Sequence, residues 1–153
     1  MGKVKIGIIG TGSISNMHMA GYTHLKNVEV VAACDISEER VKEFAKTYNI
    51  PNTFTDYNEM LKMTELEAVS VTAWNNIHAP ASIAALNAGK HVLCEKPLAL
   101  DAAQAGEMVE AAKKSGKILM VGFCRRFGDN TVALKNIIDN GIWEIFIMPR
   151  QAA

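Results

Sequence analysis

The strongest indication of the fold is the segment Val4-Lys5-Ile6-Gly7-Ile8-Ile9-Gly10-Thr11-Gly12-Ser13-Ile14-Ser15. It begins as a short run rich in β-branched residues, passes through two glycines two positions apart and opens into a helical pattern. Residues 28–34 form a second apolar run, which ends at the acid Asp35. A strand, a tight turn, a helix and a second strand in this order predict a β-α-β unit with parallel strands.

The same alternation continues along the chain. Further strands are expected at residues 53–54, 68–72, 91–94 and 118–121. Helices are expected at residues 14–25, 37–48, 57–63, 79–88 and 101–115, with Ser37 as the N-cap of the second and an Asp101/Gln104 capping box opening the last. Residues 1–121 are therefore predicted to form an α/β domain of the Rossmann type, a doubly wound parallel sheet with helices on both faces.

The pattern changes in residues 122–153. A loop is expected at residues 122–129, followed by a helix at 131–140 that Gly141 ends. Residues 142–148 have strand propensity and much apolar surface, so we expect them to begin a sheet whose other strands are absent. This part is interpreted as a linker helix and the first strand of a truncated C-terminal domain. An unpaired apolar strand invites pairing, so a homo-oligomer is one expectation.

The glycine turn predicts a dinucleotide site. Gly10 would permit the tight turn, and Gly12 would let backbone amides approach a pyrophosphate at the helix N-terminus. Serine stands at the third motif position, Ser15, where glycine or alanine is usual. Asp35 is placed to bond the ribose hydroxyls, although it could instead cap the helix that starts near Ser37. The candidate cofactor-binding residues of this half are Gly10, Thr11, Gly12, Ser13, Ile14, Asp35 and Arg40.

NAD is the expected cofactor, and NADP is less favoured. The carboxylate of Asp35 would face the 2′-phosphate of NADP, which carries the same sign of charge. Arg40, a turn into the next helix, would soften this repulsion.

The predicted strand at 91–94 ends in Glu95, Lys96 and Pro97. Open α/β sheets bind ligands beyond the carboxyl ends of their strands, so Lys96 is expected to project into the crevice. A lysine there can hold or relay the proton of a substrate hydroxyl, which makes Lys96 the candidate catalytic residue. The alternative is an ordinary surface lysine. Upstream, residues 73–78 form a polar and aromatic loop in which Asn75 or Asn76 could cap a helix and His78 could be structural.

Composition excludes several functions. The chain has 153 residues with 16 basic and 16 acidic side chains, so no long-range field attracts nucleic acid or an anionic membrane. The three cysteines lack paired spacing, and no metal site is expected from His18, His24 or His91. Without a signal peptide or a long apolar run, a cytoplasmic location is expected.

Four segments together resemble one family: the glycine turn with Asp35, Asn75-x-x-His78, the run from Ala88 to Ala99 around Glu95-Lys96-Pro97, and Val121-Gly122-Phe123-x-Arg125-Arg126-Phe127. They are similar to the N-terminal half of the glucose-fructose oxidoreductase and inositol dehydrogenase (Gfo/Idh/MocA) family. The resemblance implies NAD(P)-dependent oxidation or reduction at a secondary alcohol of a sugar, polyol or derivative.

By position, the resemblance implies roles for particular residues. Lys96 matches the family's catalytic lysine, with Glu95 and Pro97 as its neighbours at the nicotinamide. Asn75 and His78 match the loop that lines the cofactor, together with Ala73 and Trp74. Trp74 stands where proline is common. Arg126 matches an arginine near the domain junction.

Family members continue into an open-faced β-sheet domain that supplies the substrate pocket and a D-x-x-x-H element. We expect this second domain to be missing, so that the chain binds NAD(H) but turns over little substrate. The alternative from another class is a stand-alone, non-catalytic dinucleotide-binding or regulatory module.

Overall fold

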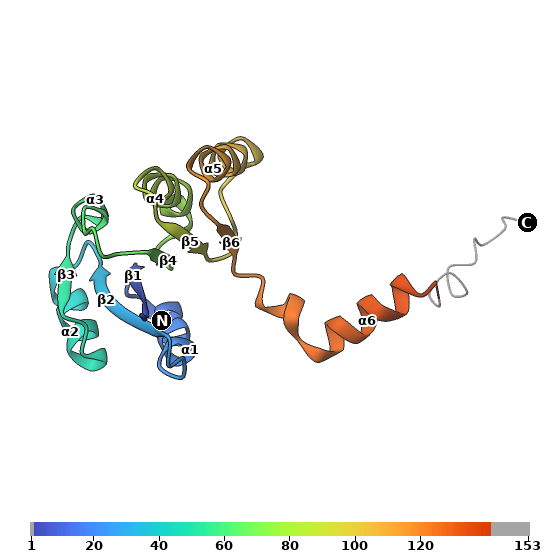
Figure 1. Ribbon diagram of the computed structural model, residues 1–153, viewed down its shortest axis with the longest axis horizontal. Helices are drawn as coiled ribbons and strands as arrows, with labels where there is room; N and C mark the ends of the chain where they lie inside the picture. Colours follow the sequence, from blue (N-terminus) through green and yellow to red (C-terminus); the bar gives the residue numbers. More distant parts are fainter. Residues whose placement is uncertain (1, 142–153) are drawn as a thin grey trace, which may run out of the picture. The chain divides into compact units, whose positions relative to one another are not determined.

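The computed structural model describes residues 2–141. Six strands form one parallel sheet in the order β3-β2-β1-β4-β5-β6 (Figure 1). The strands are β1 (Val4–Ile9), β2 (Val28–Cys34), β3 (Asn52–Phe54), β4 (Ala68–Val71), β5 (His91–Cys94) and β6 (Leu119–Val121). The helices are α1 (Ser13–Tyr22), α2 (Glu38–Tyr48), α3 (Tyr57–Leu61), α4 (Asn75–Asn87), α5 (Ala102–Ser115), the 3₁₀ turn η1 (Cys124–Phe127) and α6 (Asp129–Asp139). The predicted Rossmann-type sheet is confirmed.

The chain divides into two compact units, Met1–Gly122 and Phe123–Ala153. The first holds the whole sheet and α1 to α5, and the second contains η1 and α6. The strand expected at residues 142–148 lies outside the described residues.

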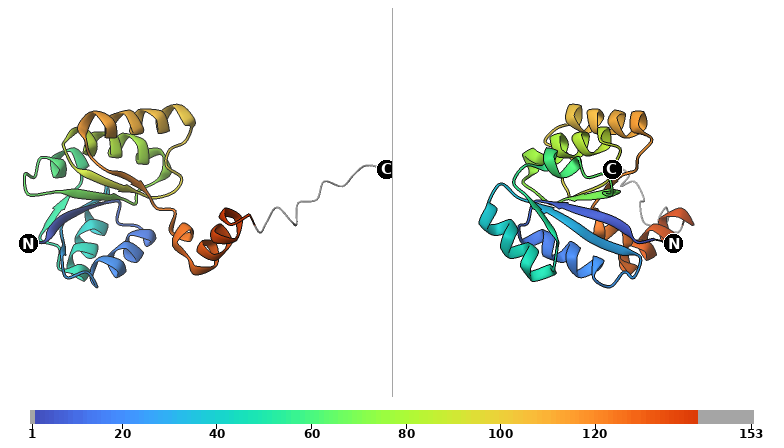
Figure 2. Two further views of the ribbon diagram at one scale, coloured as in Figure 1. Left: turned by 45° about the vertical axis from the view of Figure 1, so that its right-hand side comes forward. Right: turned by 60° about the vertical axis from the view of Figure 1, so that its left-hand side comes forward.

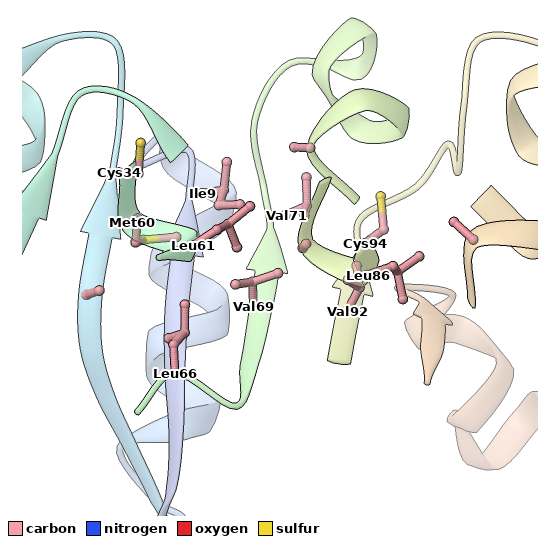
Figure 3. Close-up of a cluster of buried hydrophobic side chains, with 14 of the residues drawn as sticks. Ile9, Cys34, Met60, Leu61, Leu66, Val69, Val71, Leu86, Val92 and Cys94 are labelled. Atoms are coloured by element: carbon pink, nitrogen blue, oxygen red, sulfur yellow. The ribbon is translucent and has the colours of Figure 1, made fainter. Parts of the chain in front are cut away.

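Helices cover both faces of the sheet in the first unit. Figure 2 shows α1 and α2 on one face and α4 and α5 on the other. Each face has its own apolar cluster, because alternate residues of a strand point to opposite sides. On β1, Ile6 and Ile8 pack with Phe44 of α2, whereas Ile9 packs with Val71 and Met60 in the larger cluster of Figure 3.

Several local predictions are confirmed. Ser37 caps α2, its Oγ accepting from the Arg40 amide at 3.3 Å. Asp101 caps α5 and accepts from the Gln104 amide at 2.9 Å. The return bond of the expected capping box goes elsewhere, since Gln104 Oε1 lies 3.5 Å from the amide of Leu100 rather than bonding Asp101.

Two helix boundaries differ from the prediction by three residues or more. Helix α1 ends at Tyr22 instead of residue 25, and Thr23 is its C-cap. Helix α4 begins at Asn75 instead of residue 79, with Pro80 inside it. Trp74 is the N-cap of α4 and makes no side-chain cap bond, so neither Asn75 nor Asn76 is the cap. Pro80 lies in the second turn of α4, and the helix accommodates it.

The functional edge of the sheet follows from the strand order. Strands β1 and β4 are neighbours in the sheet, and the chain runs outward from them in opposite directions. Ligands of open α/β sheets bind at such a switch point, beyond the carboxyl ends of the strands. The segments after β1, β2, β4 and β5 therefore lie at the edge of the sheet where a ligand is expected.

Candidate functional site

Gly10 lets the turn after β1 approach the segment after β4. Its φ is +93°, a left-handed conformation that favours glycine. A Cβ atom at this position would lie 2.5 Å from both Cα and N of Ala73. The Thr72 hydroxyl closes the contact by donating to the Gly10 carbonyl at 2.7 Å. The first glycine is therefore required by the close packing of two backbone segments.

Gly12 has a different role, because a Cβ atom there would meet nothing within 4 Å. It is the N-cap of α1, which has no side-chain cap bond and no acidic residue in its first turn. The amides at the start of α1 are thus left for an anion, which the helix dipole favours. Ser15, the unusual third motif residue, is fully buried and donates to the Gly12 carbonyl at 2.5 Å.

The carboxylate of Asp35, directly after β2, accepts several hydrogen bonds from within the protein. Its Oδ2 accepts from the amide and the hydroxyl of Thr11, each at 2.9 Å, and its Oδ1 accepts from the Ser37 amide at 3.0 Å. Arg40 Nη1 lies 3.6 Å from Oδ1. Burial alone would raise the pKa of Asp35, but these hydrogen bonds and then the Arg40 charge outweigh it and lower the pKa. The carboxylate is therefore ionised, and its hydrogen bonds with Thr11 stabilise the glycine turn.

These segments enclose a cleft of about 470 Å³ at the switch point. It is lined by Ile9, Gly10, Gly12, Ser13, Ile14, Cys34, Asp35, Ile36, Arg40, Tyr57, Thr72, Ala73, Trp74, Asn76 and Ile77. Most of the predicted cofactor-binding residues come together here. Ile36, Tyr57 and Ile77 also line the cleft and were not predicted from the sequence. Ile36 is 88% exposed and Trp74 is 77% exposed, so two large apolar side chains of the cleft wall face open space.

Three predicted residues of the same segments do not line the cleft. Thr11 is buried and bonds Asp35, and Asn76 lines the cleft where Asn75 was expected. His78 is 1% exposed, with Nδ1 2.6 Å from the Pro97 carbonyl and Nε2 3.1 Å from the Ala73 carbonyl. His78 thus links the segment after β4 to the segment after β5, which fits the alternative of a structural role. The place beside the cofactor that the resemblance implies for it stays a prediction.

Glu95, Lys96 and Pro97 follow β5, one strand beyond the cleft. Lys96 is exposed, and the Lys96–Pro97 peptide bond is cis. Within residues 2–141, no hydrogen bond or ion pair involves Lys96 Nζ. Arg126 lies in η1 of the second unit, and its place near a cofactor remains a prediction.

A partly buried hydrogen-bond network that ends at Glu95 was not predicted from the sequence. His18 Nε2 lies 3.0 Å from Glu95 Oε1, and His18 Nδ1 lies 3.4 Å from the Ser70 hydroxyl. Ser70 in turn contacts the Tyr22 hydroxyl at 2.5 Å. His18 is separated from Glu95 by 77 residues, so no local pattern pairs them, and the sequence indicated only that His18 lacked metal-ligand spacing.

Two further observations concern the described part of the chain alone. No three His, Cys, Asp or Glu side chains in residues 2–141 are grouped so that they could hold a metal ion. No helix in the same range has the length and apolar character needed to cross a membrane.

A parallel sheet in this strand order, with the glycine turn and the acid at its switch point, defines a dinucleotide-binding domain. The family model described as "Oxidoreductase family, NAD-binding Rossmann fold" (GFO_IDH_MocA) matches residues 4–123. The chain belongs to this Gfo/Idh/MocA family of oxidoreductases and has its NAD-binding Rossmann fold.

Several dehydrogenases are similar to this protein over most of its chain. Inositol 2-dehydrogenase of Salmonella typhimurium is 42% identical over 141 residues, which are 90% of this chain and 42% of that protein. D-glucoside 3-dehydrogenase of Escherichia coli is 34% identical over 97% of this chain and 43% of that protein. The crystal structure of scyllo-inositol dehydrogenase from Lactobacillus casei with NAD(H) and scyllo-inositol superposes with a TM-score of 0.84 at 28% identity, covering 91% of this chain and 42% of that one. The chain thus spans about two-fifths of the length of these relatives.

Proposed function

We propose that the chain binds NAD in the cleft at the switch point and serves as the cofactor domain of an oxidoreductase that acts on a secondary alcohol of a sugar or polyol. One observation carries the proposal. The open position beside Gly12, the uncapped start of α1 and the ionised Asp35 belong to the same cleft. This arrangement fits a pyrophosphate and a ribose.

Different residues of the cleft would bind different parts of the cofactor. Amides at the start of α1 would hold the pyrophosphate, with Gly12 leaving room for its approach. A carboxylate oxygen accepts about two hydrogen bonds, and Oδ2 of Asp35 already has two from Thr11. We therefore expect Asp35 to accept one bond from the ribose, at Oδ1. The exposed side chains of Ile36 and Trp74 would cover the apolar faces of the adenine ring.

Arg40 bears on the choice between NAD and NADP. The ionised Asp35 would repel a 2′-phosphate, so NAD is preferred. Arg40 lies 3.6 Å from Oδ1 and is about half exposed, which makes it a partial counter-charge. We expect Arg40→Ala to weaken NADP binding more than NAD binding, as titration of both cofactors would measure.

Lys96 is the residue proposed to move the proton. Bound NAD supplies the acceptor for hydride from the alcohol carbon. Lys96, at the carboxyl end of β5, would take the proton of the hydroxyl and return it in the reverse direction. The relatives are named for inositol and D-glucoside, so a ring carrying adjacent secondary alcohols is the substrate class we propose.

Steady-state kinetics of the protein that contains this domain, with NAD and inositols or glucosides as substrates, test the function. Lys96→Met should lower kcat by about 10²- to 10⁴-fold, the usual share of a general acid or base, and leave the Kd for NAD nearly unchanged. Lys46→Met is the matched control, because Lys46 is an exposed lysine on α2. An unchanged kcat in Lys96→Met would reject the role of Lys96.

A homo-oligomer and a cytoplasmic location remain predictions from the sequence. Light scattering by the purified chain would distinguish a monomer from an oligomer.

A further inference from the structure

The carboxylate of Glu95 is held on the inside of the fold. His18 Nε2 lies 3.0 Å from its Oε1, and the backbone amide of Lys96 donates to its Oε2 at 3.0 Å. The side chains of His18 and Glu95 are only 11% and 12% exposed. Both oxygens of the carboxylate therefore have partners within the protein.

The network behind His18 gives each group a partner. With a neutral imidazole, Tyr22 donates to Ser70, Ser70 donates to His18 Nδ1, and His18 Nε2–H donates to Glu95. Burial raises the pKa of Tyr22, and its hydrogen bond with Ser70 opposes this only in part, so the phenol keeps its proton. The chain of hydrogen bonds fixes the tautomer of His18 that can bind a carboxylate.

Gly122 lies against the carboxylate of Glu95. A Cβ atom there would lie 2.9 Å from Glu95 Oε1 and 3.4 Å from Oε2. Its amide also donates to the Cys94 carbonyl at 2.8 Å, which fixes the backbone beside β5. The inward position of the Glu95 carboxylate thus depends on the small size of Gly122, directly after β6, as well as on the hydrogen bond from His18.

Lys96 is the neighbour that an outward Glu95 would reach. The Nζ of Lys96 has no hydrogen-bond or ion-pair partner among the described residues, although the preceding residue, Glu95, carries a carboxylate. A carboxylate within a few ångströms of an ammonium group stabilises the protonated form. Such a pair would hinder Lys96 from accepting the proton of an alcohol.

We propose that His18 is a positioning residue that holds the Glu95 carboxylate inside the fold and away from the Lys96 amine. The proposal rests on the proposed function in one respect: the position of Glu95 affects catalysis only if Lys96 transfers the proton. The positioning itself is independent of whether the chain binds NAD, so the two can fail separately.

Competitive labelling of lysines with a trace of acetic anhydride tests the positioning on the full chain. Only the unprotonated amine reacts, so the rate at each lysine, read by peptide mass spectrometry, reports how firmly its proton is held. Lys46 on α2 is the internal reference, and circular dichroism verifies the fold of each variant. The variants are His18→Leu, His18→Gln, Glu95→Gln and the double variant His18→Leu with Glu95→Gln.

His18→Leu should slow labelling of Lys96 relative to Lys46 by about tenfold, because the released carboxylate can pair with the amine. The double variant should restore the rate, since it removes the charge, and His18→Gln should stay close to wild type because an amide still donates to Glu95. Glu95→Gln alone should change the rate less than about twofold, because the carboxylate of the wild type already faces inward. A purely structural role of His18 predicts no rescue by the second substitution.

Two results would overturn the proposal. One is a folded His18→Leu variant in which Lys96 is labelled at the wild-type rate, or is slowed without rescue in the double variant. The other needs no change at His18: a large increase in Lys96 labelling in Glu95→Gln would mean that the carboxylate already faces the amine. This second result decides the matter even if His18→Leu does not fold.

Discussion

Thr11 donates two hydrogen bonds to a single oxygen of Asp35, one from its amide and one from its hydroxyl, each at 2.9 Å. The contact joins the glycine turn after β1 to the end of β2 within the protein itself. The acid of a dinucleotide site therefore has two tasks, because it shapes the turn that would hold a pyrophosphate and offers its remaining acceptor to a ribose.

Replacing Thr11 by valine tests the first of these tasks. The substitution keeps the shape of the side chain and removes one buried hydrogen bond to a charged group, so the free energy of unfolding should fall by about 1.5–3 kcal/mol. Urea denaturation measures the loss. Thr47→Val removes an exposed hydroxyl bond on α2 and should stay within about 0.5 kcal/mol of wild type. Equal effects in the two variants would contradict the assignment.

The lowered pKa of Asp35 predicts how stability depends on pH. Its folded pKa lies below the reference value of 3.8, so the stabilisation from ionised Asp35 is fully present above pH 3.8. It is lost as the pH falls through the lower folded value. The difference in unfolding free energy between wild type and Asp35→Asn should therefore be larger at about pH 6 than at about pH 2. A difference that is constant with pH would show that the carboxylate charge is not the cause.

The two glycines of the turn should respond differently to alanine. Gly10→Ala combines a positive φ with a clash against Ala73 and should cost more than about 2 kcal/mol of stability, since such backbone strain alone costs about 1–3 kcal/mol. Gly12→Ala adds a methyl group into open space and should cost less than about 1 kcal/mol, because alanine is a weaker N-cap than glycine. Thermal unfolding followed by circular dichroism separates the two, and a strongly destabilised Gly12→Ala would refute this division of roles.

The cysteines should differ in reactivity. Burial, followed by the charges of Asp56 and Asp35, raises the pKa of Cys34 to about 12, and burial raises that of Cys94 to about 11. Both thiols are therefore neutral at physiological pH and sheltered. Cys124 is exposed and should be the thiol that reacts with an aromatic disulfide reagent in the native protein. Release of more than one equivalent before denaturation would contradict this pattern.

The fold could be predicted because its signals are local. The signals of the run from Val4 to Ser15 and of the caps at Ser37 and Asp101 each act over a few residues, and the structure has them where expected. The start of α4 could not be read in the same way. The contact of His78 with the Pro97 carbonyl, 19 residues away, helps to fix this segment, and no local pattern indicates it.

The candidate site shows the same division. Gly10, Gly12 and Asp35 follow from spacing within one β-α-β unit, and the structure gathers them in one cleft. The contact of His18 with Glu95 joins α1 to the end of β5, and only the packed fold brings them together. Tyr57 likewise reaches the cleft from α3, a helix whose sequence carries no motif.

Isothermal titration calorimetry of the purified chain with NAD and NADH measures whether the cleft at the switch point binds NAD. We expect saturable one-to-one binding by the wild type, and a loss of affinity of at least about tenfold in Gly12→Ala, because a misplaced contact worth about 1.4 kcal/mol has that effect. Lys46→Met should bind as the wild type does. Absence of binding by the folded wild type, or equal affinity in Gly12→Ala, would rule out the proposed cofactor site.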